Sequence, residues 1–438
     1  METKLRLITE IAVKDQKCKF SNLIHLLNVD NLRDCFYQLK RDKASGIDGV
    51  SFSEYEANLE ANLSRLVARM KQYSYRPQAV RRTYIPKANG KMRPLGIPCI
   101  EDKVVQKAIA RILTAIYEVD FQDFSYGFRP KRGCHEAIKR LHDILMRHRI
   151  NHIIDADIKG FFDNVNHEWL IRCLKERIRD QGLLRYIKRF LKAGVMEEGN
   201  WRETEQGTPQ GGIISPILAN IYLHYILDLW LVKAVPPWCR GVVVMVRYAD
   251  DFVICVQYQD EAEKILAALQ QRLAKFGLEL ARDKTRIIEF GRYAMEHAQK
   301  RGQRAATFTF LGFTHYCGKT RKGQFKVSRT TDRKRFQSKI KAMNNWLKGV
   351  RHTAVKEWWP LLRAKLSGHF QYYGVSENYR GIQRFYFLTI RLVMKWLNRR
   401  SQKRRLNWKQ FLNYLRRYQL PKPKIGFKLY TFQLQLSL

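Results

Sequence analysis

Residues 242–256 read VVVMVRYADDFVICV, two runs of mostly apolar and β-branched residues separated by a pair of acids. Such runs are typical of β-strands, and the polar break between them predicts a hairpin with Asp250 and Asp251 at its tip. Two adjacent carboxylates repel each other and add nothing to packing, whereas a divalent cation would relieve the repulsion. A polar β-turn without a metal is the alternative, because Asp is common in turns. The stretch therefore indicates strands that carry a candidate metal site.

A third carboxylate stands at the end of another apolar stretch. Asp157 closes residues 153–157 and is followed by IKGFF at 158–162. One carboxylate at a strand end and a pair on a neighbouring hairpin can converge on two Mg²⁺ ions, which activate a hydroxyl and stabilise a departing pyrophosphate. Mg²⁺ uses few protein carboxylates and completes its shell with water and phosphates. This sparse set of acids predicts nucleotidyl transfer.

The pattern along the chain alternates between strands and helices up to about residue 310 and is helical and basic from 331 onward. A basic hairpin is expected over 79–98, turning at Asn89-Gly90. Further helices and strands are expected at 20–72, 102–117, 153–157, from 167, from 215, at 260–276, near 286 and near 308. This alternation predicts an α+β fold with a mixed sheet backed by helices.

The segment 213–231 is apolar enough to suggest a membrane span. Asn220, His224 and Asp228 interrupt it, and Pro216 near its start is a helix N-terminal signal. We therefore expect a buried core helix and no membrane association.

Charge is the strongest compositional signal. The chain has 81 Lys and Arg against 40 Asp and Glu, a formal net charge of +41, which predicts a polyanionic partner. Residues 319–438 hold 30 basic and 3 acidic residues, a net charge of +27, so this region is expected to bind nucleic acid. Eight cysteines without a CxxC pair, and an N-terminus unlike a signal peptide, favour the reducing cytoplasm.

Three motifs in order resemble those of reverse transcriptases, in particular the enzymes encoded by bacterial group II introns. They are YADD at 248–251, whose Ala is typical of the group II enzymes, DIKGFF at 157–162, and QGTPQGGIISP at 206–216. Further segments resemble other blocks of the family: IPK at 85–87, RPLGIP at 93–98, SYGFRP at 125–130, GLEL at 277–280, KT at 284–285, FLGF at 310–313 and GIDGV at 46–50. The resemblance covers residues 30 to 400.

The resemblance implies a right-hand polymerase with fingers, a palm built on a mixed or antiparallel sheet, and a helical thumb. We expect an N-terminal extension and the start of the fingers at 1–75. Fingers and palm are expected at 76–318, and a basic thumb or maturase domain with a short basic tail at 319–438.

The resemblance also implies a catalytic centre. Asp157 and Asp250 are the expected principal ligands of two Mg²⁺ ions, with Asp251 as an auxiliary ligand and Ile158 included in the metal-binding set. The three aspartates are the expected catalytic residues.

Nucleotide and RNA contacts follow from the same resemblance. Lys87 and Arg93 are expected to hold the triphosphate of the nucleotide. Phe162 is expected to exclude a ribose 2′-hydroxyl, with simple core packing as the alternative. Phe161 is the likelier core residue, because alternation along an extended chain would point the two rings to opposite faces. The other expected nucleotide contacts are Pro209, Gln210, Gly211 and Lys284, the last either a general acid toward pyrophosphate or a phosphate contact. The expected RNA contacts in the tail are Lys403, Arg404 and Arg405.

The implied function is an RNA-dependent DNA polymerase that uses an RNA template, a DNA or RNA primer and dNTPs, and that also binds its group II intron RNA as a splicing maturase. Two alternatives stay open: a maturase acting mainly as an RNA-folding cofactor, and a host-domesticated enzyme of defence or repair. An RNA-dependent RNA polymerase is disfavoured by Phe162 and Ala249. No Cys/His cluster follows residues 421–424, so an HNH endonuclease is not expected.

Overall fold

The computed structural model describes residues 2–86, 92–197, 200–202, 206–208, 211–400 and 406–430. The chain forms two compact units. The first comprises Met1–Gly133, Ile154–Ile254 and Asp260–Arg286, and the second Cys134–Ile153, Cys255–Gln259 and Ile287–Leu438. The predicted domain limits at 76 and 319 follow chain order and remain a prediction.

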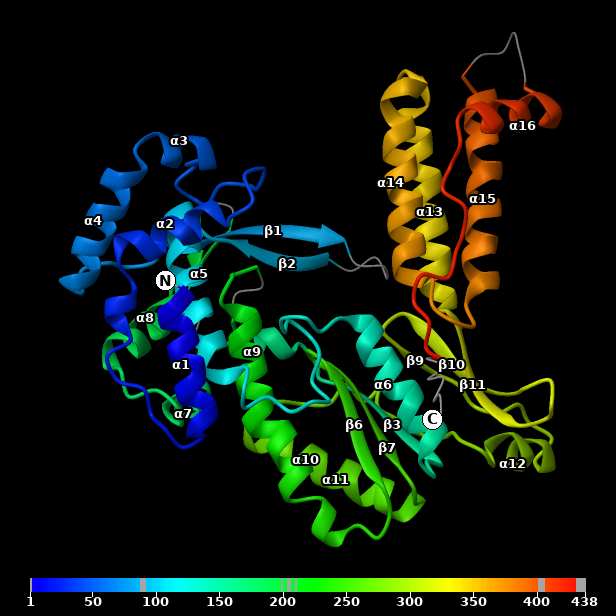
Figure 1. Ribbon diagram of the computed structural model, residues 1–438, viewed down its shortest axis with the longest axis horizontal. Coiled ribbons are helices and arrows are strands. Elements are labelled where there is room, and N and C mark those ends of the chain that lie inside the picture. The colour runs from blue at the N-terminus through cyan, green and yellow to red at the C-terminus, as the bar shows by residue number, and fades with distance from the viewer. Residues whose placement is uncertain are drawn as a thin grey trace, which may run out of the picture. The chain divides into compact units, whose positions relative to one another are not determined.

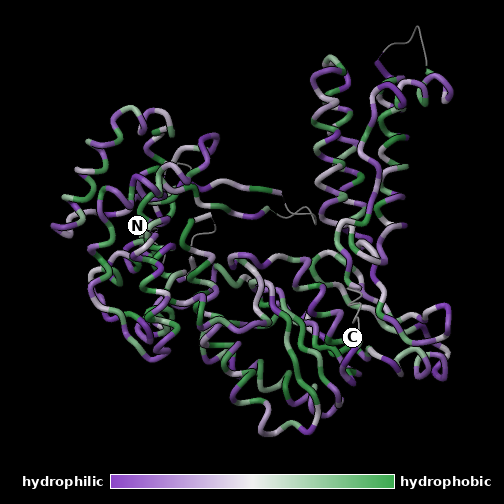
Figure 2. Tube along the Cα trace, viewed as in Figure 1, coloured by the Kyte–Doolittle hydropathy of each residue, from purple (hydrophilic) through white to green (hydrophobic). Residues whose placement is uncertain are grey.

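The sheet that carries the predicted acids has the strand order β6-β7-β3-β8. Its strands are β6 (Val243–Tyr248), β7 (Asp251–Val256), β3 (His152–Asp157) and β8 (Arg286–Glu289). Ile153 and Ile154 of β3 and Val253, Ile254 and Val256 of β7 are buried, and the hydrophobic colour dominates the strands of this sheet in Figure 2. The predicted strands are thus confirmed, and burial of the branched side chains explains why they form.

The helix predicted from Ser215 begins at that residue and is buried, as expected for a core helix. It runs as α9 (Ser215–Leu223), a π-helical turn (His224–Asp228) and α10 (Leu229–Lys233). By length and composition, residues 215–238 would pass as a membrane span, the one such segment in the described part of the chain, but 67% of the apolar window is buried inside the protein. Burial inside a folded unit accounts for its hydropathy.

The remaining elements of the first unit are mostly helical (Figure 1). A four-stranded sheet of order β2-β1-β4-β5 contains the predicted basic hairpin, with Ile85 opposite Arg93. The predicted turn at Asn89-Gly90 lies outside the described residues. The bounds are α1 (Glu2–Lys14), α2 (Val29–Tyr37), α3 (Phe52–Ala57), α4 (Leu59–Lys71), β1 (Val80–Pro86), β2 (Met92–Ile97), α5 (Ile100–Tyr117), α7 (His167–Lys175), α8 (Gln181–Leu191), β4 (Val195–Glu197), β5 (Asn200–Arg202) and α11 (Gln259–Lys275).

The second unit combines a three-stranded sheet of order β11-β10-β9 with helices. Within it, α13 and α14 each pack on α15, the three lying side by side in Figure 1. The bounds are α6 (Cys134–Arg147), α12 (Ala294–Lys300), β9 (Phe308–Phe310), β10 (Phe313–Lys319), β11 (Phe325–Thr331), α13 (Arg333–Gly349), α14 (Val355–Tyr373), α15 (Tyr379–Asn398) and α16 (Trp408–Arg417). The prediction that elements after 331 are helical is confirmed for the described residues.

Several elements were not foreseen from the sequence. Helices α6 and α8, the hairpin β4–β5 and the hairpin β10–β11 were not predicted, although the buried apolar residues of both helices recur at helical spacing. Residues Phe161–Asp163 form a 3₁₀ turn rather than extended chain. Phe161 is buried as expected and Phe162 is half-buried, but the cause is this turn and not strand alternation.

Candidate active site

The hairpin between β6 and β7 turns at Ala249 and Asp250, so the two predicted acids stand at its tip. Asp250 lies in the turn and Asp251 is the first residue of β7. Ala249 has a φ of 58°, a left-handed value that a two-residue hairpin turn requires and that a side chain disfavours. Gly127 lies against this turn, because a Cβ there would stand 2.3 Å from the Ala249 nitrogen. Because Gly127 has no side chain, the backbone of its loop can pack directly against the hairpin turn.

Asp157 ends β3, and its main chain is held by the segment after α11. The Asp157 carbonyl accepts a hydrogen bond from the Ala281 amide at 2.8 Å, and the Lys159 amide donates to the Glu279 carbonyl at 2.9 Å. Ile158 is bridged to Leu280 between these two bonds, so its own main-chain groups point away from that neighbour. Its side chain is buried, and its carbonyl is the one ligand atom it can offer to a cation.

Asp250 is held in surroundings that oppose its ionisation. Burial is the main cause that raises the pKa of its carboxyl, and the nearby Asp157 raises it further, while Arg93 and Arg247 lower it. These effects mean that the Asp157 and Asp250 carboxylates and the Arg93 guanidinium are close enough to interact. The structure therefore brings together two of the predicted metal ligands and one predicted triphosphate contact.

Lys284 provides the positive charge that faces Asp157. Its ammonium donates to Asp157 Oδ2 at 2.5 Å, and both side chains keep access to solvent. The hydrogen bond to Asp157 is the main cause that raises the pKa of Lys284, and Asp250 contributes to the rise. The lysine therefore stays protonated at neutral pH and belongs to the same cluster.

The donor set fits Mg²⁺ by its chemistry. Asp157 and Asp250 offer hard carboxylate oxygens. Burial and, after it, the repulsion from Asp157 raise the pKa of Asp250, and a bound cation would offset both. In the described part of the chain no three His, Cys, Asp or Glu side chains are gathered as a metal cluster. Participation of Asp251 and Ile158 remains a prediction.

Phe162 lies beside the start of the predicted glutamine-glycine segment. The Thr208 amide donates to the Phe162 carbonyl at 2.7 Å, and the Gly207 amide donates to the Val165 carbonyl at 2.8 Å. Gly207 has a φ of 88°, and a Cβ there would meet the carbonyls of 162 and 163 at 2.9 and 2.8 Å. The half-buried Phe162 ring contacts Phe161 at a centroid distance of 5.3 Å. These bonds fix the Phe162 backbone next to residues 206–208.

Gly211 makes a close backbone approach, although to the protein itself. A Cβ at Gly211, whose φ is 115°, would stand 2.4 Å from the Gly96 carbonyl oxygen of β2. Contact of Gly211 with a nucleotide or template stays a prediction. Six further residues predicted to contact nucleotide or RNA lie outside the described residues: Lys87, Pro209, Gln210, Lys403, Arg404 and Arg405.

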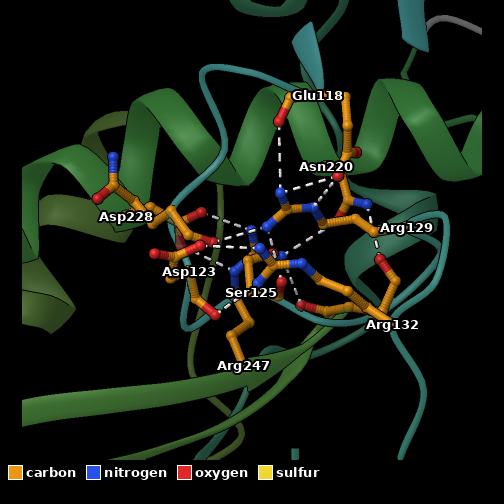
Figure 3. Close-up of polar contacts among 11 residues, drawn as sticks. Glu118, Asp123, Ser125, Arg129, Arg132, Asn220, Asp228 and Arg247 are labelled. Atoms are coloured by element: carbon orange, nitrogen blue, oxygen red, sulfur yellow. Dashed lines mark hydrogen bonds and ion pairs between the residues drawn. The ribbon is translucent and has the colours of Figure 1, made fainter. Parts of the chain in front are cut away.

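Sequence reasoning missed the contacts among three buried polar residues behind the hairpin, Asn220, Asp228 and Arg247 (Figure 3). The Asn220 side chain also donates to the Gly127 carbonyl. The available signal was an arginine inside an apolar strand and two polar residues eight positions apart in an apolar helix. Both patterns indicate buried polar groups that need partners.

Comparison with known proteins agrees with this geometry. The family described as reverse transcriptase (RNA-dependent DNA polymerase) matches residues 85–315. The chain is 42% identical over 201 residues to group II intron-encoded protein LtrA of Lactococcus lactis subsp. cremoris, covering 46% of this chain and 33% of LtrA. It is 36% identical over 276 residues to protein YkfC of Escherichia coli (strain K12), covering 55% of this chain and 71% of YkfC.

A third relative is nuclear intron maturase 4, mitochondrial, of Arabidopsis thaliana, 28% identical over 137 residues, or 30% of this chain and 16% of the maturase. The chain thus spans about a third of LtrA and a larger part of YkfC. The predicted similarity to group II intron-encoded proteins and intron maturases is confirmed.

Proposed function

This chain belongs to the reverse transcriptase family, and we propose from that premise that it extends a primer with deoxynucleotides along an RNA template. The observation that carries the proposal is the cluster at the end of β3 and the tip of the β6–β7 hairpin. There Asp157 and Asp250 interact with each other and with the cations Lys284 and Arg93. Paired acids flanked by phosphate-binding cations suit the transfer of a nucleotide.

Asp157 and Asp250, with Asp251 and the Ile158 carbonyl beside them, would hold two Mg²⁺ ions. When bound, these ions supply the activation of a primer 3′-hydroxyl and the neutralisation of charge on the departing pyrophosphate. Because Asp157 stands at the end of β3 and Asp250 at the hairpin tip, both carboxylates would already be oriented before the metal ions and the nucleotide bind.

Arg93 and Lys284 would bind the nucleotide phosphates. A guanidinium is a fixed fork of donors, and an ammonium is a compact charge on a flexible stem. Because Asp157 raises the pKa of Lys284, this lysine carries its proton at neutral pH and can donate a hydrogen bond, or the proton itself, to a pyrophosphate oxygen. Lys87 would add a third cation to this set.

Phe162 would select the sugar. Its half-buried ring is fixed by the 3₁₀ turn and by the Thr208 hydrogen bond, so it can wall off a ribose 2′-hydroxyl. Gly211, with Pro209 and Gln210, would contact the incoming nucleotide or the template.

RNA would bind to basic surfaces in both units. In the first unit a groove of about 680 Å³ is lined by Arg76, Arg185, Lys188, Arg189 and Lys192. Among the described residues no acid forms an ion pair with any of these five side chains, so they favour phosphate as a partner. In the second unit α13–α15 carry many exposed basic residues. Residues 1–75, 76–318 and 319–438 would then serve as N-terminal extension, fingers with palm, and thumb.

A second role is favoured by the names of two relatives. LtrA is called a group II intron-encoded protein and the Arabidopsis relative an intron maturase. We propose that this chain, too, binds a group II intron RNA in the cytoplasm and assists its splicing. Intron RNA that splices equally fast with and without the protein, at low Mg²⁺, would contradict this second role alone.

The polymerase proposal is tested with Asp157→Ala and Asp250→Ala. Each variant should lose Mg²⁺-dependent dNTP incorporation on an RNA template, because one carboxylate ligand is removed. RNA affinity should stay close to that of the wild type, since most positive charge lies elsewhere. The measurements are primer extension and filter binding.

Asp163→Ala is the matched control, because this exposed aspartate lies close in sequence and is not a proposed ligand. It should extend primers like the wild type. Primer extension at the wild-type rate by the Asp250 variant would refute the proposed catalytic centre.

A further inference from the structure

Arg247 is a fully buried guanidinium two residues before the hairpin turn. It forms a bidentate ion pair with the equally buried Asp228, with Nε to Oδ1 at 2.8 Å and Nη2 to Oδ2 at 2.5 Å (Figure 3). Two parallel bonds between planar groups fix the plane of the guanidinium as well as its position. The arginine therefore has one orientation available.

The partners of Arg247 come from the core helix behind the sheet. Asp228 ends the π-helical turn that interrupts α9 and α10, an irregularity frequent at functional sites. Asn220 of α9 accepts from Arg247 Nη1 at 3.2 Å, and its own amide donates to the Gly127 carbonyl at 2.8 Å. The helix thus holds both the arginine and the loop that lies against the hairpin turn.

The loop that carries Gly127 is itself fixed by a second buried arginine. Arg129 Nη1 donates to the carbonyls of Gln122 and Ser125 at 2.7 and 2.8 Å, and its Nε donates to Glu118 Oε1 at 3.0 Å (Figure 3). The bonds of Arg129 therefore hold the loop that places Gly127 against the turn.

One further donor of Arg247 reaches the catalytic turn. Its Nη1 donates to the Ala249 carbonyl at 3.0 Å, which belongs to the peptide that joins Ala249 to Asp250. The amide side of Ala249 is closed by Gly127, and its φ of 58° is one that L side chains rarely adopt. Held from both sides, the peptide sets the backbone direction from which the Asp250 side chain leaves.

Stability alone does not explain this arrangement. Removing two charges from water costs about as much as their attraction returns, so an apolar pair of similar size would stabilise the fold as well. An apolar pair cannot donate a hydrogen bond to the Ala249 carbonyl. The feature that distinguishes the charged pair is its bond to the catalytic turn.

We propose that Arg247, Asp228 and Asn220 form a clamp that holds the Ala249–Asp250 peptide so that the Asp250 carboxylate is aimed for metal binding. The three are positioning residues, because none of them is proposed to touch substrate or metal. The inference rests on the proposed function, since it assigns the metal site to Asp250.

The test replaces the whole ion pair rather than one half of it. The double variant Arg247→Met, Asp228→Leu removes both buried charges together and should keep a melting temperature near that of the wild type. Its Mg²⁺ requirement or kcat should nevertheless worsen by about 10- to 100-fold, the usual effect of losing a residue that orients a metal ligand. RNA affinity should not change. Arg247→Met alone should melt lower, because Asp228 is left buried without a partner.

The matched control removes another largely buried ion pair, Arg177 with Asp120 at 3.5 Å, whose arginine bonds the carbonyls of Ala12 and Gln16 and not the turn. Arg177→Met, Asp120→Leu should keep the Mg²⁺ midpoint and kcat of the wild type. A folded Arg247→Met, Asp228→Leu protein with a wild-type Mg²⁺ midpoint and kcat would overturn the clamp.

If the double variant does not fold, Asp228→Asn provides the second test, because it keeps the side-chain shape and one acceptor oxygen. Wild-type Mg²⁺ dependence in this folded variant would equally overturn the proposal. A wild-type protein without any Mg²⁺-dependent incorporation would instead refute the proposed function, so the two failures are distinguishable.

Discussion

Asp250 is a carboxylate whose surroundings oppose its charge until a cation arrives. Burial and Asp157 raise its pKa, while Arg93 and Arg247 partly offset the rise. Asp157, in contrast, already has a counter-ion in Lys284. The two acids are therefore held differently, one by a direct ion pair and one by a clamped backbone. At the residue scale, the site would bind cations because two carboxylates are held in place, and not because many acids are gathered there.

Phe162 allows a prediction at the same scale. Phe162→Ala should admit rNTPs while retaining much of the dNTP activity, because the half-buried ring is proposed to exclude the 2′-hydroxyl. The measurement is primer extension with each nucleotide set. Phe161→Ala is the matched control: its ring is buried, so this variant should lose about 3–5 kcal/mol of unfolding free energy without gaining rNTP use. If Phe162→Ala behaves like the control, the ring is a core residue.

At the scale of elements, side-chain caps decide where helices begin and how they are joined. Asp180 is a buried cap of α8: its Oδ1 accepts from the Leu183 amide at 2.9 Å, and its Oδ2 accepts from the amides of Leu23 and Ile24. One carboxylate thus satisfies the start of a helix and a turn more than 150 residues earlier in the chain. A cap with partners in two segments stabilises their packing as well as the helix.

Asp180→Ala should therefore lower the free energy of unfolding more than the loss of an ordinary helix cap does. Two buried amides and one part-buried amide lose their acceptor, so the unfolding free energy should fall by about 2 kcal/mol or more. Ser51→Ala, which removes the capping box of α3 near the surface, should cost about 1 kcal/mol. Chemical denaturation measures both. Equal losses would mean that the long-range bonds of Asp180 add nothing to stability.

At the scale of the whole molecule, the positive charge is spread over both units and is densest toward the C-terminus. Residues 319–438 carry 30 basic and 3 acidic residues, and the basic groove on α8 adds a cluster in the first unit. Such a distribution suits a long polyanion that touches the protein at many points. The affinity for RNA should accordingly depend strongly on salt.

A stripe on α13 makes this dependence testable. Lys334, Lys341 and Lys348 are exposed and seven residues apart, so they share one side of the helix. Replacing all three by Ala should weaken RNA binding and reduce the slope of log affinity against log salt by up to about 2, at roughly 0.7 for each phosphate that is no longer neutralised. Binding isotherms at several salt concentrations give the slope.

The control for charge alone removes three exposed lysines outside α13, namely Lys264 and Lys275 of α11 and Lys300 of α12, the last paired with Glu296. Its slope should stay near that of the wild type. If both triple variants lower the slope equally, binding responds to net charge and not to the α13 surface.

Sequence alone predicted the strands around residues 242–256 and 153–157, the core helix from Ser215, and the family. These features depend on patterns that can be read locally: runs of β-branched residues, Pro216 at a helix start, and the motifs at 157–162, 206–216 and 248–251, whose order is typical of the family. The same patterns placed Asp250 and Asp251 at a hairpin tip, because the tip is set by the residues on either side of it.

Tertiary structure alone decided which side chains meet. The pairing of Lys284 with Asp157 spans 127 residues, and Arg247 finds Asp228, Asn220 and the Ala249 carbonyl only when the helix packs behind the sheet. In the sequence, Arg247 and Asp228 are isolated polar residues in apolar segments, with nothing to show which one satisfies the other. Burial makes them partners, because a charge removed from water must find its counter-charge among whatever groups the packing brings within reach.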